Sequence, residues 1–523
     1  METEREILEV DVLFVGAGPA SLSGAIHLRH LIEQHNRTVA TAGARVEASI
    51  AVIEKGREIG AHNLSGAILD PKALRELFPD DHEASTPLTL PVAQDDLYYL
   101  TESGKIRIPP LLPSLRNEGN FLISLNRFVQ WLGEKAGALG IDLFPGFAGT
   151  ELIFQEDRLV GIRTGDKGVD REGRPKGTYE PGVDIQAKVV ILGEGVRGSL
   201  TKQLAERLNL DQGKNPQQYA LGIKEVWELP EPSMQNGRVI HTLGYPLRHE
   251  NYGGGFVYHL GSQLSIGLVI GLDYWDPALD PHLLFQEFKS HPFISSLLKG
   301  AQLIHYGAKA IPEGGYYSIP KCVVNGGLII GDSAGFLNSQ RLKGIHLAMK
   351  SGMLAAETVL EGLLRTDFTE VLLNGYVKRL KASWVESELY PVRNFHQGFH
   401  HGLFPGILQA GLQTVTGGRG WKDPLPARAA HELMRKSPVP MGALPAPSQS
   451  ASGHGEFSRD KLTDVHYSGI QHEEDQPNHL RITNFDICHG PCVTEYQNPC
   501  VRFCPAQVYE MREAEDGRED SFS

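Results

Sequence analysis

Cysteine is missing from most of this chain. No cysteine precedes Cys322 in the 523 residues, and the other four, Cys488, Cys492, Cys500 and Cys504, lie close together near the C-terminus. A secreted scaffold held by disulfides distributes its cysteines through the fold. That class is therefore excluded, and the cluster indicates a metal or redox site in a reducing compartment. Cys322 is predicted to be a buried core thiol.

The chain also lacks a long apolar run and a leader. No stretch approaches the roughly 18 consecutive apolar residues of a transmembrane helix. Residues 1–6 are mostly charged, with no apolar segment, which argues against a secretory signal. Their acidic side chains argue against a mitochondrial transit peptide. We therefore expect a protein without a spanning helix that stays in the compartment where it is made.

Basic residues are in the minority, with 50 Lys and Arg against 63 Asp and Glu and a net charge of −13. Nucleic-acid binding relies on clustered Lys and Arg, so no nucleic-acid partner is expected. The hydrophobic and charged fractions, 41% and 22%, are ordinary for a folded chain and exclude a disordered one. The 58 glycines exceed the usual share of about 7%. They are compatible with turns at which backbone approaches a ligand.

A nucleotide-binding motif stands near the N-terminus. Residues 10–15 have the continuous apolar character of a buried parallel strand, and a glycine-rich turn follows from Gly16 to Gly18. A helix is predicted to about residue 34, and the next strand at 49–53. This order is a βαβ unit with a dinucleotide fingerprint. Taken alone, such a glycine string is also compatible with a plain turn.

Four residues of this unit are predicted to hold a nucleotide. Gly16 permits the tight turn, and Gly18 lets backbone N–H groups approach a pyrophosphate at the helix N-terminus. Glu54, at the end of the second strand, can accept hydrogen bonds from the ribose hydroxyls. Ser21 replaces the third glycine of the fingerprint and is small enough for close packing of helix on strand.

A second signal follows a later apolar strand, residues 188–192. The turn Gly193–Gly198 after it contains Glu194 and Arg197, and a helix is expected from Ser199. Such a turn could pass beneath the same dinucleotide. An ordinary strand–helix connection explains this segment equally well when it is taken alone.

The third signal is a strand that ends in Gly331-Asp332, followed by Lys343-Gly344 and a helix over 345–357. Asp332 can bind a ribityl hydroxyl. A helix N-terminus near Gly344 would stabilise negative charge on a flavin pyrimidine ring. The three signals in this order resemble the flavoproteins of the glutathione-reductase and hydroxylase type, and the resemblance implies FAD.

The segments between these signals resemble one family, the electron-transfer-flavoprotein:ubiquinone oxidoreductases. The resemblance covers residues 8 to about 510. The similar strings are Glu54–Pro71, Tyr252–His259, Val269–Tyr274, Gly307–Gly315, Gly331–Asn338, His472–Leu480 and Phe503–Glu510. Such ungapped strings are far more specific than a nucleotide fingerprint.

The resemblance implies an α/β (α+β mixed) fold in five parts. These are a discontinuous FAD-binding domain with two dinucleotide-binding folds (1–215 and 320–395), an inserted β-rich ubiquinone-binding domain (216–319), a membrane-facing segment (396–435), a Pro- and Ser-rich connector (436–457) and a C-terminal ferredoxin-like iron–sulfur unit (458–523).

The function implied is the passage of electrons from reduced electron transfer flavoprotein, through FAD and a [4Fe-4S] cluster, to ubiquinone at a membrane. The enzyme would be an electron-transferring-flavoprotein dehydrogenase. The alternatives are an FAD-dependent prenyl-lipid reductase or hydroxylase of the same fold, and a non-enzymatic, membrane-bound flavoprotein scaffold that has lost its cluster. We expect the protein on the cytoplasmic face of a bacterial-type inner membrane, bound peripherally.

Two segments are expected to serve the quinone and the membrane. In the family, Gly253 and Gly254 fall where backbone contacts the quinone ring, although a β-turn is the simpler explanation. Residues 399–421 carry no charge before Arg419 and suit a membrane surface. Their apolar area comes from Phe399, Leu403, Phe404, Ile407, Leu408 and Leu412, with Trp421 as an anchor. The proline-rich loop 108–115 is a second candidate, and either segment could instead be ordinary core.

The cysteine cluster leaves two possibilities open. Thiolates suit iron–sulfur clusters, and the CxxC spacing common in zinc sites is missing. In the family, the Cys-Pro-Ala cysteine, here Cys504, is one ligand, and three more come from a downstream CxxCxxC segment that this sequence does not contain. The sequence favours a shortened chain with an absent or incomplete cluster. The alternative is a local set of Cys488, Cys492, Cys500 and Cys504.

Overall fold

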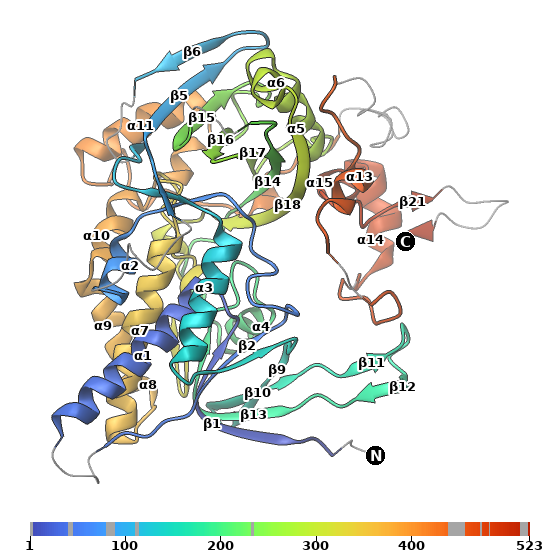
Figure 1. Ribbon diagram of the computed structural model, residues 1–523. Helices are drawn as coiled ribbons and strands as arrows, with labels where there is room; N and C mark the ends of the chain where they lie inside the picture. The colour runs from blue at the N-terminus through green and yellow to red at the C-terminus, as the bar shows by residue number, and fades with distance from the viewer. Residues whose placement is uncertain are drawn as a thin grey trace.

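The computed structural model describes residues 4–39, 45–79, 89–109, 115–231, 235–437, 455–470, 473–480, 482–512 and 521–522. Most of the loop 108–115 and of the connector 436–457 lies outside these residues. Figure 1 shows a helix-covered sheet in the lower part of the molecule, a second sheet above it, and a small C-terminal unit at the right.

The first sheet has the parallel centre that the nucleotide motif predicts. Its order is β19-β20-β13-β1-β2-β8, and β10 and β9 extend it from β13 as antiparallel strands. Val15 of β1 lies opposite Leu192 of β13 and Ile53 of β2. The carboxyl ends of these parallel strands therefore meet at one edge, where such sheets bind their ligands. The strands are β1 (Ile7–Val15), β2 (Ile50–Glu54), β8 (Asp142–Pro145), β9 (Gly149–Gln155), β10 (Arg158–Thr164), β13 (Asp184–Leu192), β19 (Val323–Val324) and β20 (Gly327–Ile329).

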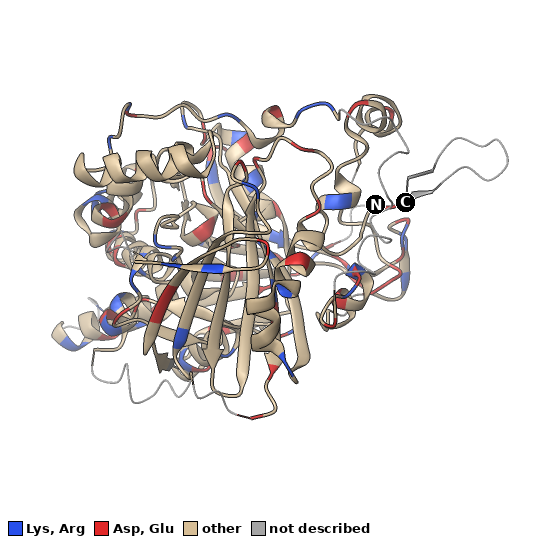
Figure 2. Cartoon of the chain, turned by 90° about the horizontal axis from the view of Figure 1, so that it is seen from above, with Lys and Arg blue, Asp and Glu red and all other residues tan. Residues whose placement is uncertain are grey.

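A second, mostly antiparallel sheet stands above the first. Its order is β18-β14-β17-β16-β15-β5-β6. In β14, Leu221 and Ile223 enter an apolar core, whereas Gly222 and Lys224 line a cavity on the opposite face. The strands at the centre of Figure 2 carry few charged residues. The strands are β5 (Gln94–Leu100), β6 (Lys105–Ile108), β14 (Tyr219–Glu228), β15 (Arg238–Gly244), β16 (Gly253–Leu260), β17 (Gln263–Gly271) and β18 (Gln302–Pro312), with α5 (Pro281–Ser290) and α6 (Pro292–Leu298) packed on the core side.

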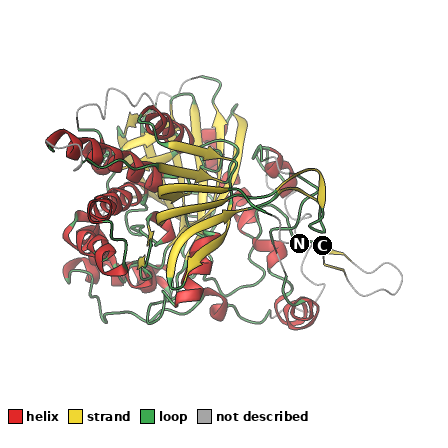
Figure 3. Ribbon diagram, turned by 90° about the horizontal axis from the view of Figure 1, so that it is seen from below, coloured by secondary structure: helices red, strands yellow, loops and turns green. Residues whose placement is uncertain are grey.

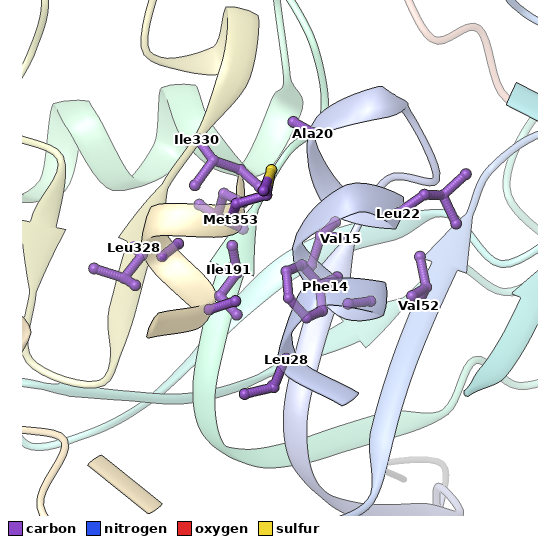
Figure 4. Packing of buried hydrophobic residues seen from close by; sticks show 14 of the residues in the cluster. Phe14, Val15, Ala20, Leu22, Leu28, Val52, Ile191, Leu328, Ile330 and Met353 are labelled. Atoms are coloured by element: carbon purple, nitrogen blue, oxygen red, sulfur yellow. The ribbon is translucent and has the colours of Figure 1, made fainter. Parts of the chain in front are cut away.

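Helices gather on one side of the strands, as Figure 3 shows at the left. Phe14, Ile191 and Met353 pack between the first sheet and helices α1 and α7 (Figure 4). A Cβ on Gly24 of α1 would lie 2.9 Å from the carbonyl oxygen of Gly352 in α7, so glycine lets the two backbones touch. The helices of this part are α1 (Pro19–Thr38), α2 (Lys72–Leu77), α3 (Leu125–Ala138), α4 (Ser199–Leu208), α7 (Ile345–Arg365), α8 (Glu370–Leu373), α9 (Gly375–Ala382) and α10 (Trp384–Leu389).

Strands β5 and β6 belong to the second sheet, although the sequence-based division places residues 94–108 in the FAD-binding part. Leu97 of β5 lies opposite His241 of β15 in a parallel pairing. The chain therefore enters the second sheet twice, once before residue 110 and again after residue 218. A small separate sheet is made of β3 (Ala67–Leu69) and β4 (Thr89–Pro91), which precede β5, and of β7 (Phe121–Ile123), which follows β6.

The residues after 395 form two features, a helix beside the cavity and a C-terminal unit. The helix is α11 (Leu403–Val415), with the short α12 (Ala430–Leu433) after it. The unit contains α13 (Lys461–His466), α14 (Phe485–Ile487), the kinked helical turns Cys488–Tyr496, α15 (Cys500–Phe503), β21 (Met511–Arg512) and β22 (Ser521–Phe522). None of the described helices combines the length and the apolarity needed to cross a bilayer.

Polar contacts fasten the C-terminal unit to the second sheet and to a hairpin. Tyr306 of β18 donates its hydroxyl to the carbonyl oxygen of Pro505 over 3.0 Å. The Lys461 ammonium lies 2.9 Å from Asp280, at the start of α5. The hairpin of β11 (Lys167–Val169) and β12 (Pro175–Glu180) reaches the unit through Lys176, whose Nζ donates to the carbonyl oxygen of Asp475 over 2.7 Å. The unit is thus held at two places far apart in the sequence.

Candidate functional site

One large cavity lies between the two sheets, with a volume of about 1400 Å³. It exceeds the usual range for a single small ligand, about 300–1,000 Å³, so a dinucleotide and a second molecule fit the same space. All but one of the predicted FAD and quinone residues line it. They are Gly16, Gly18, Glu54, Glu194, Arg197, Gly331, Asp332, Lys343, Gly344, Gly253 and Gly254. Ser21 does not line the cavity and is fully buried against Gly193, consistent with the packing role expected for it.

The first glycine turn gives the cavity a wall made of backbone. Gly16 has a φ of +91°, and a Cβ there would lie 2.6 Å from the carbonyl oxygen of Gly193. Only glycine combines that conformation with the close passage of β1 and β13. A Cβ on Gly18 would meet nothing within 4 Å, because this residue faces the open cavity at the start of α1. A pyrophosphate fits beside it, at the positive end of the helix.

Glu54 is held as a carboxylate at the end of β2. Its Oε2 accepts the backbone N–H of Ala17 over 3.0 Å, and its Oε1 accepts that of Gly56 over 2.8 Å. Burial alone would raise the pKa of Glu54, but the hydrogen bonds from His62, Ala17 and Gly56 outweigh burial and lower it. The carboxylate oxygens keep free lone pairs for the hydroxyls of a ribose.

The second turn places its two predicted residues differently. The carboxylate of Glu194 accepts the backbone N–H and the hydroxyl of Thr201, both over 2.7 Å, and thereby caps α4. The turn therefore offers a nucleotide the backbone of Glu194 and not its carboxylate. Arg197 lies over the ring of Tyr219, with its guanidinium carbon 5.1 Å from the ring centre. The cation remains at the cavity wall.

Asp332 is a half-buried acid on the cavity wall. Among the described residues, none hydrogen-bonds its carboxylate, and burial raises its pKa to about 6 against the opposing charge of Lys309. A ribityl hydroxyl would supply the missing hydrogen bond. The Asp332 carboxylate and the open space beside Gly18 together make the cavity suitable for FAD.

The N-terminus of α7 meets the cavity next to two further residues. Gly344 precedes the helix and lines the cavity. Lys343 donates its Nζ to the carbonyl oxygen of Arg341 over 3.0 Å, and burial together with the charge of Arg341 lowers its pKa to about 8. A flavin ring here would lie near both a helix N-terminus and a buried amine, which favour negative charge on the ring.

The opposite end of the cavity is apolar and lies beside α11. Gly253 and Gly254 open β16, where a Cβ on Gly254 would lie 2.5 Å from the carbonyl oxygen of Thr242. The wall continues into α11, from which Leu403, Ile407, Ala410, Gly411, Thr414 and Val415 line the cavity. A flat ring with a prenyl tail fits this end, because glycine exposes backbone to the ring and α11 offers apolar surface to the tail.

The exposed part of α11 is unusually apolar. The exposed fractions of Phe404, Leu408 and Val415 are 64%, 65% and 87%, and Trp421 just beyond is 74% exposed. Leu403 and Phe399 are half-buried and belong to the cavity wall. The predicted apolar segment therefore contains residues that line the cavity and residues that face outward, and Val415 at the end of α11 does both.

Several cavity residues belong to no sequence motif that would identify them as site residues. Lys224, His241, Lys309 and Glu313 all line the cavity from the second sheet. Lys309 and Glu313 fall inside one of the family-like strings, Gly307–Gly315, which is the only pointer that could have found them. Their convergence depends on the pairing of β14 with β18.

Four free thiols lie in the C-terminal unit. Cys488 and Cys492 lie on either side of a kink at Gly490. Burial and the neighbouring Cys488 raise the pKa of Cys492, and burial with Cys492 and Cys488 raises that of Cys500 to about 11. Cys504 is buried at the end of α15, where its Sγ accepts the backbone N–H of Val508 over 3.5 Å. Four thiols in one small unit fit the donor count of a [4Fe-4S] cluster.

Gly18→Val is expected to abolish FAD binding. The first carbon of the valine side chain would contact no protein atom, but the side chain would fill the space that a pyrophosphate needs. The flavin absorbance per folded chain measures the effect. Gly177→Val is the matched control, because a Cβ at this exposed residue of β12 also meets nothing within 4 Å. Full flavin content in folded Gly18→Val would contradict the site.

Cys488→Ser and Cys504→Ser are expected to lower the iron content equally. A local set of four thiols predicts about four irons per chain after anaerobic reconstitution, and the loss of any one ligand impairs the cluster. Cys322→Ala, in the core of the first sheet, is the control and should leave iron unchanged. Iron that depends on Cys504 but not on Cys488 would assign the cluster to Cys504 with ligands outside this set.

Solved structures share the fold over most of the chain. A geranylgeranyl bacteriochlorophyll reductase-like protein from Thermoplasma acidophilum matches 82% of this chain and 96% of its own, with a TM-score of 0.59 and 17% identity. The flavin-dependent brominase Bmp2 matches 80% of this chain and 96% of its own, with a TM-score of 0.52 and 16% identity. At such identities the likeness shows the fold alone.

Sequence relatives are far closer. A family model described as ETF-QO, ubiquinone-binding, matches residues 219–311, and one described as electron transfer flavoprotein-ubiquinone oxidoreductase, 4Fe-4S, matches residues 455–523.

Three curated relatives carry the name electron transfer flavoprotein-ubiquinone oxidoreductase. The Pseudomonas aeruginosa protein is 42% identical over 98% of this chain and 92% of its own. The mitochondrial protein of Dictyostelium discoideum is 40% identical over 99% and 85%, and that of Homo sapiens is 41% identical over 98% and 83%. Identity of this level across almost the whole chain means that the protein belongs to the electron transfer flavoprotein-ubiquinone oxidoreductase family.

Proposed function

We propose that this protein oxidises reduced electron transfer flavoprotein and reduces ubiquinone at a membrane surface. The observation that carries the proposal is the single cavity, which has nucleotide-binding strand ends at one end and Gly253, Gly254 and α11 at the other. FAD and ubiquinone would therefore bind within one cavity, where electrons can pass from the flavin to the quinone. FAD supplies the chemistry when bound, because it accepts electrons one or two at a time.

The residues of the first sheet are proposed to bind and orient the FAD. The backbone at Gly16 and Gly18 holds the pyrophosphate, and Glu54 accepts the ribose hydroxyls. Asp332 accepts a ribityl hydroxyl, and the turn at Gly331 carries it into the cavity with a φ of +59°. Gly344 and Lys343 face the ring, while Arg197 and the backbone of Glu194 close the wall.

The C-terminal unit is proposed to hold the [4Fe-4S] cluster. Cys504 and, with it, Cys488, Cys492 and Cys500 supply the thiolates. The unit packs against β18 and α5 through Tyr306, so the thiols lie on the outer side of the quinone sheet. Electron transfer flavoprotein would dock near this unit, where the cluster is accessible from outside.

The division of the chain is proposed to follow the sheets. The FAD-binding part comprises the first sheet and its helices, within 1–215 and 320–395. The ubiquinone-binding part comprises residues 216–319 and also residues 94–108, which form two of its strands. Residues 396–435 face the membrane, residues 436–457 connect, and residues 458–523 form the iron–sulfur unit.

The exposed apolar face of α11 is proposed to lie on the lipid, which lets a quinone tail pass from the bilayer into the cavity. A helix of this kind binds at the interface through its buried apolar area. Since no described helix can span a bilayer, such contact would be peripheral. The cytoplasmic face of a bacterial inner membrane is the proposed location, because electron transfer flavoprotein is a soluble donor.

Anaerobic turnover tests the function. Reduced electron transfer flavoprotein and a short-chain ubiquinone analogue are mixed with the holoprotein, and ubiquinol is measured. We expect ubiquinol formation that requires both the donor protein and bound FAD. Failure to oxidise the donor, together with NAD(P)H-driven reduction or hydroxylation of a prenyl lipid, would contradict the proposal and assign the protein to the alternative class.

Phe404→Asp/Leu408→Asp should release the protein from membranes. Burying each side chain contributes about 1.5–3 kcal/mol, so losing both weakens liposome binding on the order of 100-fold or more. The variant should keep its FAD and its turnover with the short-chain quinone, because Phe404 and Leu408 do not line the cavity. Reduction of long-tail ubiquinone in vesicles should fall.

The matched control places the same charges on another exposed apolar pair. Leu364 and Val371, at the end of α7 and in α8, are 45% and 85% exposed. Leu364→Asp/Val371→Asp should bind liposomes as the unmodified protein does. Equal binding by the α11 variant, or equal loss in the control, would mean that another surface contacts the membrane.

A further inference from the structure

A buried acid stands at the quinone end of the cavity without a role in binding FAD. Glu313 follows β18, is 2% exposed and lines the cavity. The hydroxyl of Tyr252 lies 3.5 Å from its Oε2. Tyr252 directly precedes Gly253, so the acid and the proposed quinone site share one corner of the cavity.

A row of polar side chains leads from this corner toward the surface. The ring of Tyr252 meets the ring of His396 edge to face, with centroids 4.5 Å apart. His396 Nε2 lies 3.2 Å from Asp273 Oδ2, and His400 Nε2 lies 3.9 Å from the same oxygen. Exposure increases along the row, from His396 at 1% through Asp273 at 10% to His400 at 16%.

Quinone reduction gives this row a chemical purpose. Two electrons and two protons convert ubiquinone into ubiquinol, and one O–H bond forms at each carbonyl oxygen. The donor protein and the cofactors account for the electrons. A site that opens toward lipid, as proposed above, receives no protons from that side, so the protein itself has to carry them inward.

We propose that Glu313 donates protons to ubiquinone as it is reduced, and that His396, Asp273 and His400 return protons to Glu313 from the surface. The proposal rests on the quinone reductase function proposed above. In each transfer the O–H bond of the Glu313 carboxyl breaks as an O–H bond of the quinol forms. The resulting carboxylate takes its next proton along the row, and solvent supplies it at His400.

The pKa of Glu313 suits a proton donor. Burial raises its pKa to about 7, with His396 opposing and Asp273 reinforcing the rise, and with Tyr252 hydrogen-bonded to it. A proton donor works best when its pKa lies near the working pH. Burial lowers the pKa of His396, but the hydrogen bond and charge of Asp273 and the charge of Glu313 outweigh burial and raise it. Burial lowers the pKa of His400 despite Asp273.

Asp273, His396 and His400 also lie close enough together to surround one metal ion. The contact between His396 and Asp273 favours a protonated imidazole, which has no lone pair for a metal at that nitrogen. We interpret this cluster as a proton route, and bound zinc is the outcome of the experiment that would contradict this interpretation.

The central variant is Glu313→Gln, which keeps the shape and removes the transferable proton. Turnover from reduced electron transfer flavoprotein is measured with a ubiquinone analogue and with ferricyanide, which accepts an electron and no proton. Quinone turnover should fall about 100-fold or more, while ferricyanide turnover stays unchanged. In the unmodified protein, quinone turnover should decline as the pH rises through about 7, since the acid loses its proton, and Glu313→Asp should retain a similar decline.

Asp276→Asn is the matched control. Asp276 lies three residues after Asp273, does not line the cavity, and accepts the backbone N–H of Ala278 over 2.9 Å, which an amide oxygen can also accept. This variant should keep both turnovers. His396→Gln tests the return route independently: its quinone turnover should fall while its ferricyanide turnover stays unchanged.

A spectroscopic readout separates the inference from the function it rests on. In the infrared, pH titration of the holoprotein should show the C=O stretch of a protonated carboxyl that disappears near pH 7 and is missing in Glu313→Gln. If the unmodified protein reduces no quinone, the proposed function fails. If it reduces quinone and Glu313→Gln does so equally well, the proton route is overturned. One zinc per chain that is lost in His396→Gln would overturn it as well.

Discussion

The constraint on which the structure depends is that glycine backbone, without a side chain, borders one cavity at both of its ends. At the nucleotide end, β1 and β13 pass so closely that Gly16 cannot carry a side chain. At the quinone end, Gly254 faces the same restriction against the carbonyl oxygen of Thr242. The parallel first sheet and the antiparallel second sheet bring these two places to opposite walls of one space. Distant parts of the chain thereby form a single site.

Helix α11 connects that interior site with the outside. Its inner residues continue the cavity wall, and its outer residues present apolar surface. One helix can therefore serve both the tail of a quinone and the surface of a bilayer. The polar row from Glu313 to His400 runs past the start of this helix, so electrons, protons and quinone would reach the same corner by separate routes.

The local signals in the sequence identified residues that the structure brings to one cavity. Gly16, Glu54, Gly331 and the helix after Gly344 follow rules of spacing that act within a few residues, and the structure places all of them at the cavity. Glu194 illustrates a limit, because a carboxylate next to a helix start can cap the helix instead of meeting a ligand. The division into domains missed residues 94–108, whose partner strand lies more than 100 residues later in the chain.

The polar row near the quinone end could not have been predicted from spacing. Asp273, Glu313 and His396 are far apart in the sequence and meet only because β17, β18 and the turn after residue 395 pack together. The cysteine site could be predicted from the sequence only in part. Their types and number indicated a cluster, and the structure adds that Cys488 and Cys492 lie near Cys500; which thiols bind the cluster stays a prediction.

An experimental structure of the holoprotein with a bound short-chain ubiquinone tests the central claim most directly. The account predicts FAD along the carboxyl ends of β1, β2 and β13, and the quinone ring in the same cavity against Gly253 and Gly254, with its tail directed toward α11. A quinone bound outside this cavity, or a flavin that fills the space beside Gly253 and leaves no room for it, would contradict the account.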